Sequence, residues 1–281
     1  MFNKINIFLL VLLLLSGCVS IPSHTVRNEH ARKLASDRGW VSSLINTDNF
    51  LLQAYVPAKL KSAKELTIYI EGDGLAWINR STPSFNPTPA NPLALKLALQ
   101  DDKPAAYLAR PCQYVSFDQS PNCSQKYWSS YRFAPEVIHA TSQAIDQLKL
   151  KFGAESLVLI GYSGGGAVAA LVAAQRKDIS YLMTIAGNLD HQTWTNKQQL
   201  SPLEHSLNPA DYADKLQNIK QTHFVGGNDG ITGEFVARAY SRRFVSDLSK
   251  SIVVMPDFDH ACCWQMYWPD LKNSKLNNDE K

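Results

Sequence analysis

The chain has 281 residues, of which 45% are hydrophobic, 10% aromatic and 19% charged. This composition is typical of a globular protein and excludes a disordered or collagen-like chain. The net charge is +3, from 28 Lys and Arg against 25 Asp and Glu, and no basic block is present, so we expect no nucleic-acid partner. One uninterrupted apolar run, at the N-terminus, excludes a polytopic membrane protein.

The N-terminus has the pattern of an export signal. Lys4 precedes nine apolar residues, 7–15, which are too few to span a bilayer but suit the core of a signal peptide. The run ends in Leu-Ser-Gly followed by Cys18, which resembles the lipobox of bacterial lipoproteins. The resemblance implies that residues 1–17 are removed and that Cys18 carries acyl chains such as palmitate, which anchor the protein without spanning the membrane. The alternative is a plain secretory signal with an accidental cysteine.

The lipobox also predicts a location. Val19 follows the cysteine, and by resemblance to Gram-negative lipoproteins a residue other than Asp at this position implies the outer membrane of the bacterial cell envelope. Residues 18–45 are polar and mixed, which favours a lipidated N-terminus and tether with a short helix over 29–38.

The other four cysteines are expected to lie in an oxidising compartment, where disulfides persist. Cys112 and Cys123 flank a loop rich in Ser, Asn, Gln and Pro, so a local disulfide between them is favoured among three pairings. Cys262 and Cys263 would then be free thiols or a vicinal pair.

From residue 46 onward, the pattern alternates between strands and helices. Short apolar runs that end at turn residues predict strands at 50–55, 66–70, 105–109, 156–160, 181–186, 222–225 and 251–255. Helical patterns lie between them at 93–99, 135–152, 165–175 and 235–248. The alternation predicts one α/β domain, 46–272, with a mostly parallel sheet covered on both faces. Within it, 187–219 is the one long excursion, interpreted as a small lid, and 273–281 is interpreted as a frayed tail.

One predicted strand–turn–helix carries the strongest chemical signal. Gly161-Tyr162-Ser163-Gly164-Gly165 follows the strand at 156–160 and opens the next helix, which matches the G-x-S-x-G nucleophile elbow. The turn is so sharp that Ser163 takes a strained backbone conformation and larger neighbours than glycine would collide. The elbow raises the Ser163 hydroxyl above the sheet, close to a helix N-terminus that favours developing negative charge.

On these residues, the sequence over roughly 50–268 resembles the α/β-hydrolase superfamily, and within it exported bacterial serine hydrolases of the esterase or lipase kind. The resemblance implies an α/β-hydrolase fold, a catalytic triad in the chain order serine, acid, histidine, and no cofactor.

Two turns fit the remaining triad positions. Asp229 lies in the Gly-Gly-Asn-Asp-Gly turn after the strand at 222–225, and His260 lies in the loop after the last strand. Asn-Asp-Gly is also ordinary turn chemistry, so a purely structural Asp229 is the alternative. Asp190 follows the preceding strand and is the main alternative acid. Weaker candidates for the acid are Asp211, Asp214, Asp257 and Asp259.

The fold also needs two backbone donors for an oxyanion. The N–H of Gly164, directly after the nucleophile, is the first. The second is expected from Asp73 or Gly74 in Glu71-Gly72-Asp73-Gly74, the turn after the strand at 66–70. Relatives often carry His-Gly at this place, so the glutamate is a departure. A tight turn without a catalytic part is the alternative.

Together these residues predict a serine hydrolase for a small-molecule acyl ester, with an acyl-enzyme on Ser163, His260 as general base and Asp229 as the acid. Amides and thioesters are alternatives, because the triad does not select the leaving group. An acyl or aromatic pocket is expected from aromatic residues placed in loops, namely Tyr162, Trp77, Trp128, Tyr131, Trp194, Trp264 and Trp268.

The sequence also bears on three other classes of protein. A dinucleotide-binding turn is disfavoured because Gly161, Gly164 and Gly166 do not have the G-x-G-x-x-G spacing. No metal is expected, because the Asp, His and Cys residues within 257–263 match no zinc spacing. A non-catalytic envelope lipoprotein with a binding or scaffolding role remains the alternative function.

Overall fold

The computed structural model describes residues 21–276. The expected signal peptide, 1–17, and the expected lipidation site, Cys18, lie outside the described residues. Within 21–276, no helix is long and apolar enough to cross a bilayer.

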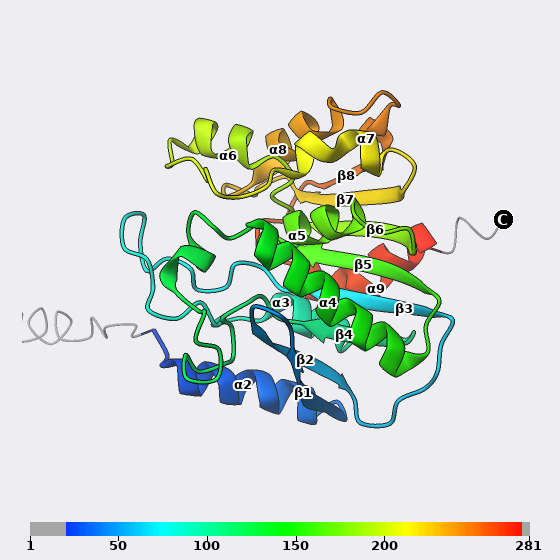
Figure 1. Cartoon of the computed structure of the whole chain (residues 1–281). Helices are drawn as coiled ribbons and strands as arrows, with labels where there is room; N and C mark the ends of the chain where they lie inside the picture. Colours follow the sequence, from blue (N-terminus) through cyan, green and yellow to red (C-terminus); the bar gives the residue numbers. More distant parts are fainter. Residues whose placement is uncertain (1–20, 277–281) are drawn as a thin grey trace, which may run out of the picture.

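Eight strands in the described residues form one sheet in the order β1-β2-β4-β3-β5-β6-β7-β8 (Figure 1). Their bounds are β1 Trp40–Asn46, β2 Leu51–Pro57, β3 Glu65–Ile70, β4 Ala105–Leu108, β5 Ser156–Tyr162, β6 Ile179–Ile185, β7 Lys220–Gly226 and β8 Ile252–Met255. β2 is antiparallel to β1 and to β4, and all the other pairs are parallel. The predicted mostly parallel α/β sheet is therefore confirmed.

Helices cover both faces of the sheet. One face carries α4 Pro135–Phe152, α5 Gly164–Ala173 and α8 Gly233–Ser241, and their apolar side chains share one core. The other face carries α2 His24–Ser36, α3 Leu93–Ala98 and α9 Trp264–Leu276 around a second core. Every residue of α5 is buried, as its small apolar sequence predicts, because glycine and alanine let the helix approach the sheet closely. This places the start of α5, and with it the Ser163 turn, near the middle of the edge of the sheet at which the parallel strands end.

The interpretation of 18–45 as a tether is wrong for the part that the structure describes. α2 begins at His24, with Ser23 as its N-cap, instead of at residue 29. β1 then pairs with β2 along its whole length, from Trp40 opposite Pro57 to Asn46 opposite Leu51. β1 is an edge strand in which four of seven side chains are exposed, and Ser42 and Ser43 interrupt its apolar residues, so it lacks the apolar run that marks a buried strand. The folded domain therefore starts before residue 46.

The C-terminal region also differs from the prediction. Residues 264–276 form α9, so the expected tail over 273–281 includes the last turn of a helix. Trp264 and Trp268 are buried in the core, and Trp268 Nε1 donates to the Tyr69 hydroxyl at 2.9 Å. Lys272 forms a buried ion pair with Asp101. Pro269 inside the helix and the polar residues around it hide the helical pattern, since proline usually ends a helix.

The excursion over 187–219 contains three short helices, α6 His191–Gln198, η3 Pro209–Tyr212 and α7 Ala213–Leu216. Two further 3₁₀ turns are η2 Gln125–Trp128 and η4 Leu248–Ser251. α6 packs against α8 and lies above α5 in Figure 1. Trp194 of α6 donates its Nε1 hydrogen to the Ile231 carbonyl at 2.9 Å, which joins the excursion to the turn after β7.

Candidate active site

The predicted elbow is a sharp turn between β5 and α5. Ser163 has φ 52° and ψ −122°, a conformation that L-residues rarely adopt. Gly165 packs directly on the backbone of β3, where a Cβ would collide with the carbonyl oxygens of Ile70 and Glu71. Ser163 N–H donates to the Ile185 carbonyl at 2.9 Å, and its carbonyl accepts from Asn188 N–H at 3.1 Å. Strands on both sides therefore hold the serine in its strained conformation.

The structure brings Ser163, His260 and Asp229 together in one hydrogen-bonded chain. His260 Nε2 lies 2.9 Å from Ser163 Oγ, and His260 Nδ1 lies 2.9 Å from Asp229 Oδ2. A carboxylate only accepts, so Nδ1 carries the proton of the neutral ring and Nε2 is free to accept from the serine hydroxyl. The three residues lie just after the carboxyl ends of three strands, β5, β7 and β8.

The Asp229 carboxylate is fully buried and held from several sides. Oδ1 accepts from the N–H groups of Ile231 and Thr232 at 2.8 and 3.1 Å, and Oδ2 accepts from the Thr232 hydroxyl at 2.8 Å. Burial acts to raise the pKa of Asp229. The interaction with His260 and the hydrogen bonds from Ile231 and Thr232 outweigh burial, so the pKa is lowered overall. Asp229 is therefore ionised at neutral pH and faces the imidazole in one orientation.

Asp190, the alternative acid, lies outside this hydrogen-bonded chain and caps a helix. It is the N-cap of α6, where Oδ1 accepts from Thr193 N–H at 3.1 Å and Oδ2 accepts from the Thr193 hydroxyl at 2.8 Å. Asn208 also donates to it at 3.3 Å. These contacts explain the residue as a helix cap.

The loop that carries His260 is held by its own neighbours. Asp259 Oδ1 accepts from Ala261 N–H at 2.8 Å and from Cys262 N–H at 2.6 Å, and these bonds lower the pKa of Asp259. The Trp264 indole donates to the carbonyls of Asp259 and His260 at 3.1 and 3.2 Å. Trp264 thus supports the histidine loop from the core instead of lining a pocket.

Of the other aromatic residues expected near a pocket, Tyr162 lies beside the site, with its ring centroid 5.4 Å from that of His260. Trp128 is buried, and its indole donates to the Ser84 carbonyl at 3.0 Å. Tyr131 stacks on His205 with ring centroids 4.1 Å apart, and Trp77 is 39% exposed. An aromatic pocket formed by the whole set is therefore not observed.

The turn after β3 lies against Ser163. A Cβ on Gly72 would be 3.3 Å from Ser163 Cβ, and a Cβ on Gly164 would collide with the Asp73 carboxylate. Within the described residues, the N–H groups of Asp73 and Gly164 have no hydrogen-bond acceptor. The Gly74 N–H has no acceptor in the described residues either, but Gly72 and Asp73 make the contacts with Ser163 and Gly164, whereas Gly74, at φ 65°, packs against the Pro87 carbonyl. The geometry therefore favours Asp73 over Gly74 as the second oxyanion donor.

Two buried arginines surround Asp73. Arg110 Nη1 lies 3.2 Å from Asp73 Oδ1, and Arg132 Nη1 lies 2.6 Å from Oδ2. Burial acts to raise the pKa of Asp73, but the two guanidiniums lower it overall. A lone carboxylate beside an oxyanion would repel it, whereas this cluster carries a net charge of +1. The arginines therefore make an acidic residue compatible with this position.

Sequence reasoning missed both arginines. Arg110 lies two residues after the end of β4, at the carboxyl edge of the sheet, a position that could have marked it. Arg132 lies in an irregular segment before α4, and no local pattern connects it with Asp73.

The contacts of Glu71 explain why a glutamate can stand where His-Gly was expected from the resemblance. Its Oε1 accepts from Gly72 N–H at 2.9 Å and its Oε2 accepts from the Tyr107 hydroxyl at 3.2 Å. The side chain is buried, and burial raises the pKa of Glu71 from 4.5 to about 7. Glu71 thus holds the first peptide of the 71–74 turn, the candidate oxyanion turn, while it titrates near neutral pH.

Glu71→Gln is expected to flatten the dependence of stability on pH. The folded state binds the Glu71 proton more tightly than the unfolded chain, so its contribution is full below pH 4.5 and is lost as the pH rises through about 7. From pH 5 to pH 8 the wild type should lose about 2 kcal/mol relative to the isosteric variant. Urea unfolding of both proteins at pH 5, 6, 7 and 8 measures this difference. Parallel stability curves would contradict it.

The four described cysteines form two disulfides, Cys112–Cys123 and Cys262–Cys263. The first is the favoured local pairing, and the second is the vicinal alternative. Residues 21–276 contain no group of three or more His, Cys, Asp or Glu side chains that could hold a metal ion.

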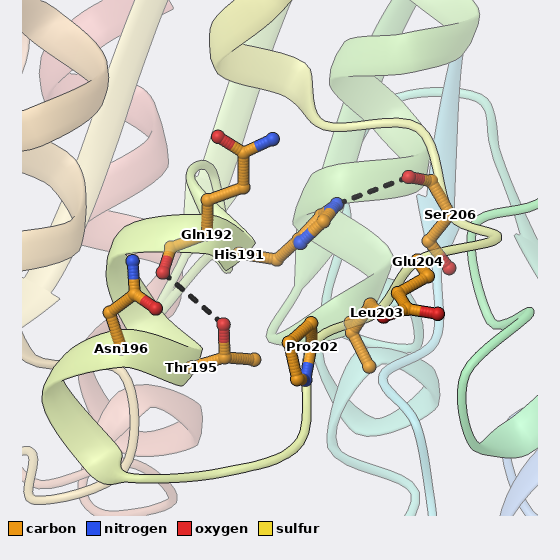
Figure 2. A pocket seen from close by; sticks show the side chains of 8 residues that line it. All are labelled: His191, Gln192, Thr195, Asn196, Pro202, Leu203, Glu204 and Ser206. Carbon is orange, nitrogen blue, oxygen red and sulfur yellow. Dashed lines mark hydrogen bonds between the residues drawn. The ribbon is translucent and has the colours of Figure 1, made fainter.

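A surface pocket lies beside α6 (Figure 2). In it, His191 Nε2 donates to the Ser206 carbonyl at 3.2 Å. Its lining consists of His191, Gln192, Thr195, Asn196, Pro202, Leu203, Glu204 and Ser206. None of the three hydrogen-bonded residues at the elbow lines it, so this pocket is separate from the candidate site.

No protein-family model and no curated protein matches the chain at the level of sequence. Solved structures do match its fold. Est1E from Butyrivibrio proteoclasticus is 15% identical, with a TM-score of 0.59 over 85% of this chain and 99% of that one. The esterase Pf2001 from Pyrococcus furiosus is 12% identical, with a TM-score of 0.59 over 85% and 90%.

A third similar structure is an α/β serine hydrolase without a lid from Xanthomonas campestris. It is 13% identical, with a TM-score of 0.51 over 84% of this chain and 91% of that one. Together the likenesses confirm the α/β-hydrolase fold that the sequence resemblance implied.

Proposed function

We propose that the protein is a serine hydrolase that cleaves a carboxylic ester. The observation that carries the proposal is the chain from Ser163 through His260 to the buried Asp229, with both bonds at 2.9 Å. The same three residue types, in the same order and on the same fold, form an acyl-transfer triad. The esterases among the structural neighbours support the same reaction class.

In the first step, the Ser163 hydroxyl attacks the acyl carbonyl while His260 Nε2 accepts its proton. The imidazolium that forms is stabilised by the ionised Asp229 across the Nδ1 bond. Negative charge develops on the carbonyl oxygen, where the unpartnered N–H groups of Gly164 and Asp73 can donate to it. The tetrahedral intermediate collapses when His260 protonates the leaving alcohol.

In the second step, water takes the place of the alcohol. His260 accepts a proton from that water, which attacks the acyl-Ser163 ester through a second tetrahedral intermediate. The free acid leaves and Ser163 recovers its proton. The chain's own residues supply every proton transfer in this cycle, so the proposed reaction needs no cofactor.

The test of this function is hydrolysis by the purified protein of p-nitrophenyl esters with acyl chains of two to twelve carbons. We expect turnover of at least the shortest esters, with matched p-nitroanilides and thioesters turned over more slowly. Preference for an anilide or thioester would replace the ester by another acyl substrate. A folded protein that turns over none of them would favour the binding or scaffolding lipoprotein.

We further propose that Cys18 anchors the enzyme to the outer membrane of a bacterial envelope. The support is the Leu-Ser-Gly-Cys pattern that ends the apolar run, together with Val19. Growth with alkyne-palmitate should label the wild type and leave Cys18→Ser unlabelled, with Cys112→Ser as a control for labelling at other cysteines. Equal labelling of wild type and Cys18→Ser would exclude the anchor without affecting the proposed hydrolysis.

A further inference from the structure

The two peptides on either side of Gly72 are each held by one side chain, and the N–H of the second, the Gly72–Asp73 peptide, is left without an acceptor in the described residues. Gly72 N–H donates to Glu71 Oε1 at 2.9 Å, and the Gly72 carbonyl accepts from Gln113 Nε2 at 2.9 Å. The C=O and N–H of a trans peptide point in opposite directions. A bond that fixes the Gly72 carbonyl therefore also fixes the direction of the Asp73 N–H.

Gln113 can adopt only one orientation in this contact. Its Oε1 accepts from Arg110 N–H at 3.1 Å, so the amide nitrogen is the group that faces Gly72. The residue is 1% exposed. It therefore lies in the wall between β4 and the oxyanion turn, where water does not replace its hydrogen bonds.

The backbone around Gln113 is strained on both sides. Cys112 and Tyr114 have φ values of 71° and 63°, which non-glycine residues seldom adopt. The Cys112–Cys123 disulfide closes the loop, and Tyr114 N–H donates to Thr88 Oγ1 at 2.8 Å. The segment is thus held in a costly conformation that directs the Gln113 side chain to one carbonyl.

We propose that Gln113 is a positioning residue, which aims the Asp73 N–H at the oxyanion by holding the opposite end of the same peptide. The inference rests on the proposed hydrolase function and adds a residue to it. Gln113 does not touch the substrate and acts through the Gly72–Asp73 peptide. Its contribution is made in the transition state, when the acyl oxygen becomes negative.

The test compares kcat and KM of Gln113→Ala and Gln113→Glu with those of the wild type, on a p-nitrophenyl ester. Gln119→Ala is the matched control, because Gln119 is an exposed glutamine in the same disulfide loop. We expect kcat of Gln113→Ala to fall about 10²-fold with KM within threefold, since an oxyanion donor acts only in the transition state. Gln119→Ala should match the wild type.

Gln113→Glu supplies a readout that a merely structural role would not change. At pH 8 its carboxylate still accepts from Arg110 N–H but cannot donate to the Gly72 carbonyl, so kcat should fall as it does for the alanine variant. Towards pH 5.5 the protonated acid can donate again. The ratio of kcat for Gln113→Glu to kcat for Gln113→Ala should then rise several-fold. Glu71, Asp73, Arg110 and Arg132 are the same in both variants, so the ratio compares only the side chains at position 113.

Three results would overturn the inference. They are a kcat for Gln113→Ala within threefold of the wild type, a loss confined to KM, and a ratio of the two variants that does not change with pH. If Gln113→Ala fails to fold, the pH-dependent ratio of Gln113→Glu to the wild type decides the question. An inactive wild type would overturn the proposed function together with this inference.

Discussion

Replacing Ser163 by alanine is expected to lower the turnover of a p-nitrophenyl ester by about 10⁴- to 10⁶-fold. The hydroxyl is the only nucleophile held 2.9 Å from His260 Nε2 in the described residues, and alanine leaves that nitrogen without a proton to accept. What remains is binding and the oxyanion donors.

The measurement is the initial rate of wild type and Ser163→Ala at saturating ester. Ser36→Ala, at the exposed end of α2, is the matched control and should keep full activity. Thermal unfolding shows whether the variants are folded. A Ser163→Ala protein that retains a tenth of the wild-type rate would rule out Ser163 as the nucleophile.

The second large effect concerns the acid. Asp229→Asn should lower kcat by roughly 10⁴-fold, because an amide at this position can donate to Nδ1 and so favours the tautomer that cannot accept from Ser163. The fold is expected to persist, since the amide oxygen can still accept from the N–H groups of Ile231 and Thr232.

Asp190→Asn distinguishes the two acids. Asp190 caps α6 and does not contact His260, so its replacement should leave kcat within a few-fold. Asparagine is itself a good N-cap, so the stability should change by no more than about 1 kcal/mol. Parallel kcat measurements on the two asparagine variants make the assignment. A larger loss for Asp190→Asn than for Asp229→Asn would reverse it.

The sequence was sufficient for the parts of the fold in which one local pattern has one structural meaning. The apolar runs of β3, β5 and β7 predict central strands, and their bounds in the structure differ from prediction by at most two residues at either end. Ser163 could be placed because G-x-S-x-G describes the turn itself, and Asp229 and His260 because the resembled fold orders them along the chain.

Elements whose stability depends on distant neighbours were not predictable in this way. β1 is largely exposed, with two serines among its apolar residues, and exists because it pairs with β2. α9 contains Pro269 but is held by Trp264 and Trp268 in the core. Asp73, Arg110 and Arg132 come from the ends of β3 and β4 and from the segment before α4, so no short stretch of sequence contains all three. Gln113 was visible only as one polar residue of a disulfide loop, and its contact with Gly72 spans 41 positions.

The proposed hydrolysis depends above all on activation of Ser163 by His260. The measurement that tests it most directly is labelling of the purified protein with a fluorophosphonate, read by intact mass, for wild type, Ser163→Ala and His260→Ala. We expect a single adduct on the wild type, none on Ser163→Ala, and labelling of His260→Ala slowed by several orders of magnitude. A folded wild type that takes up no adduct, or a Ser163→Ala protein labelled as fast as the wild type, would contradict it.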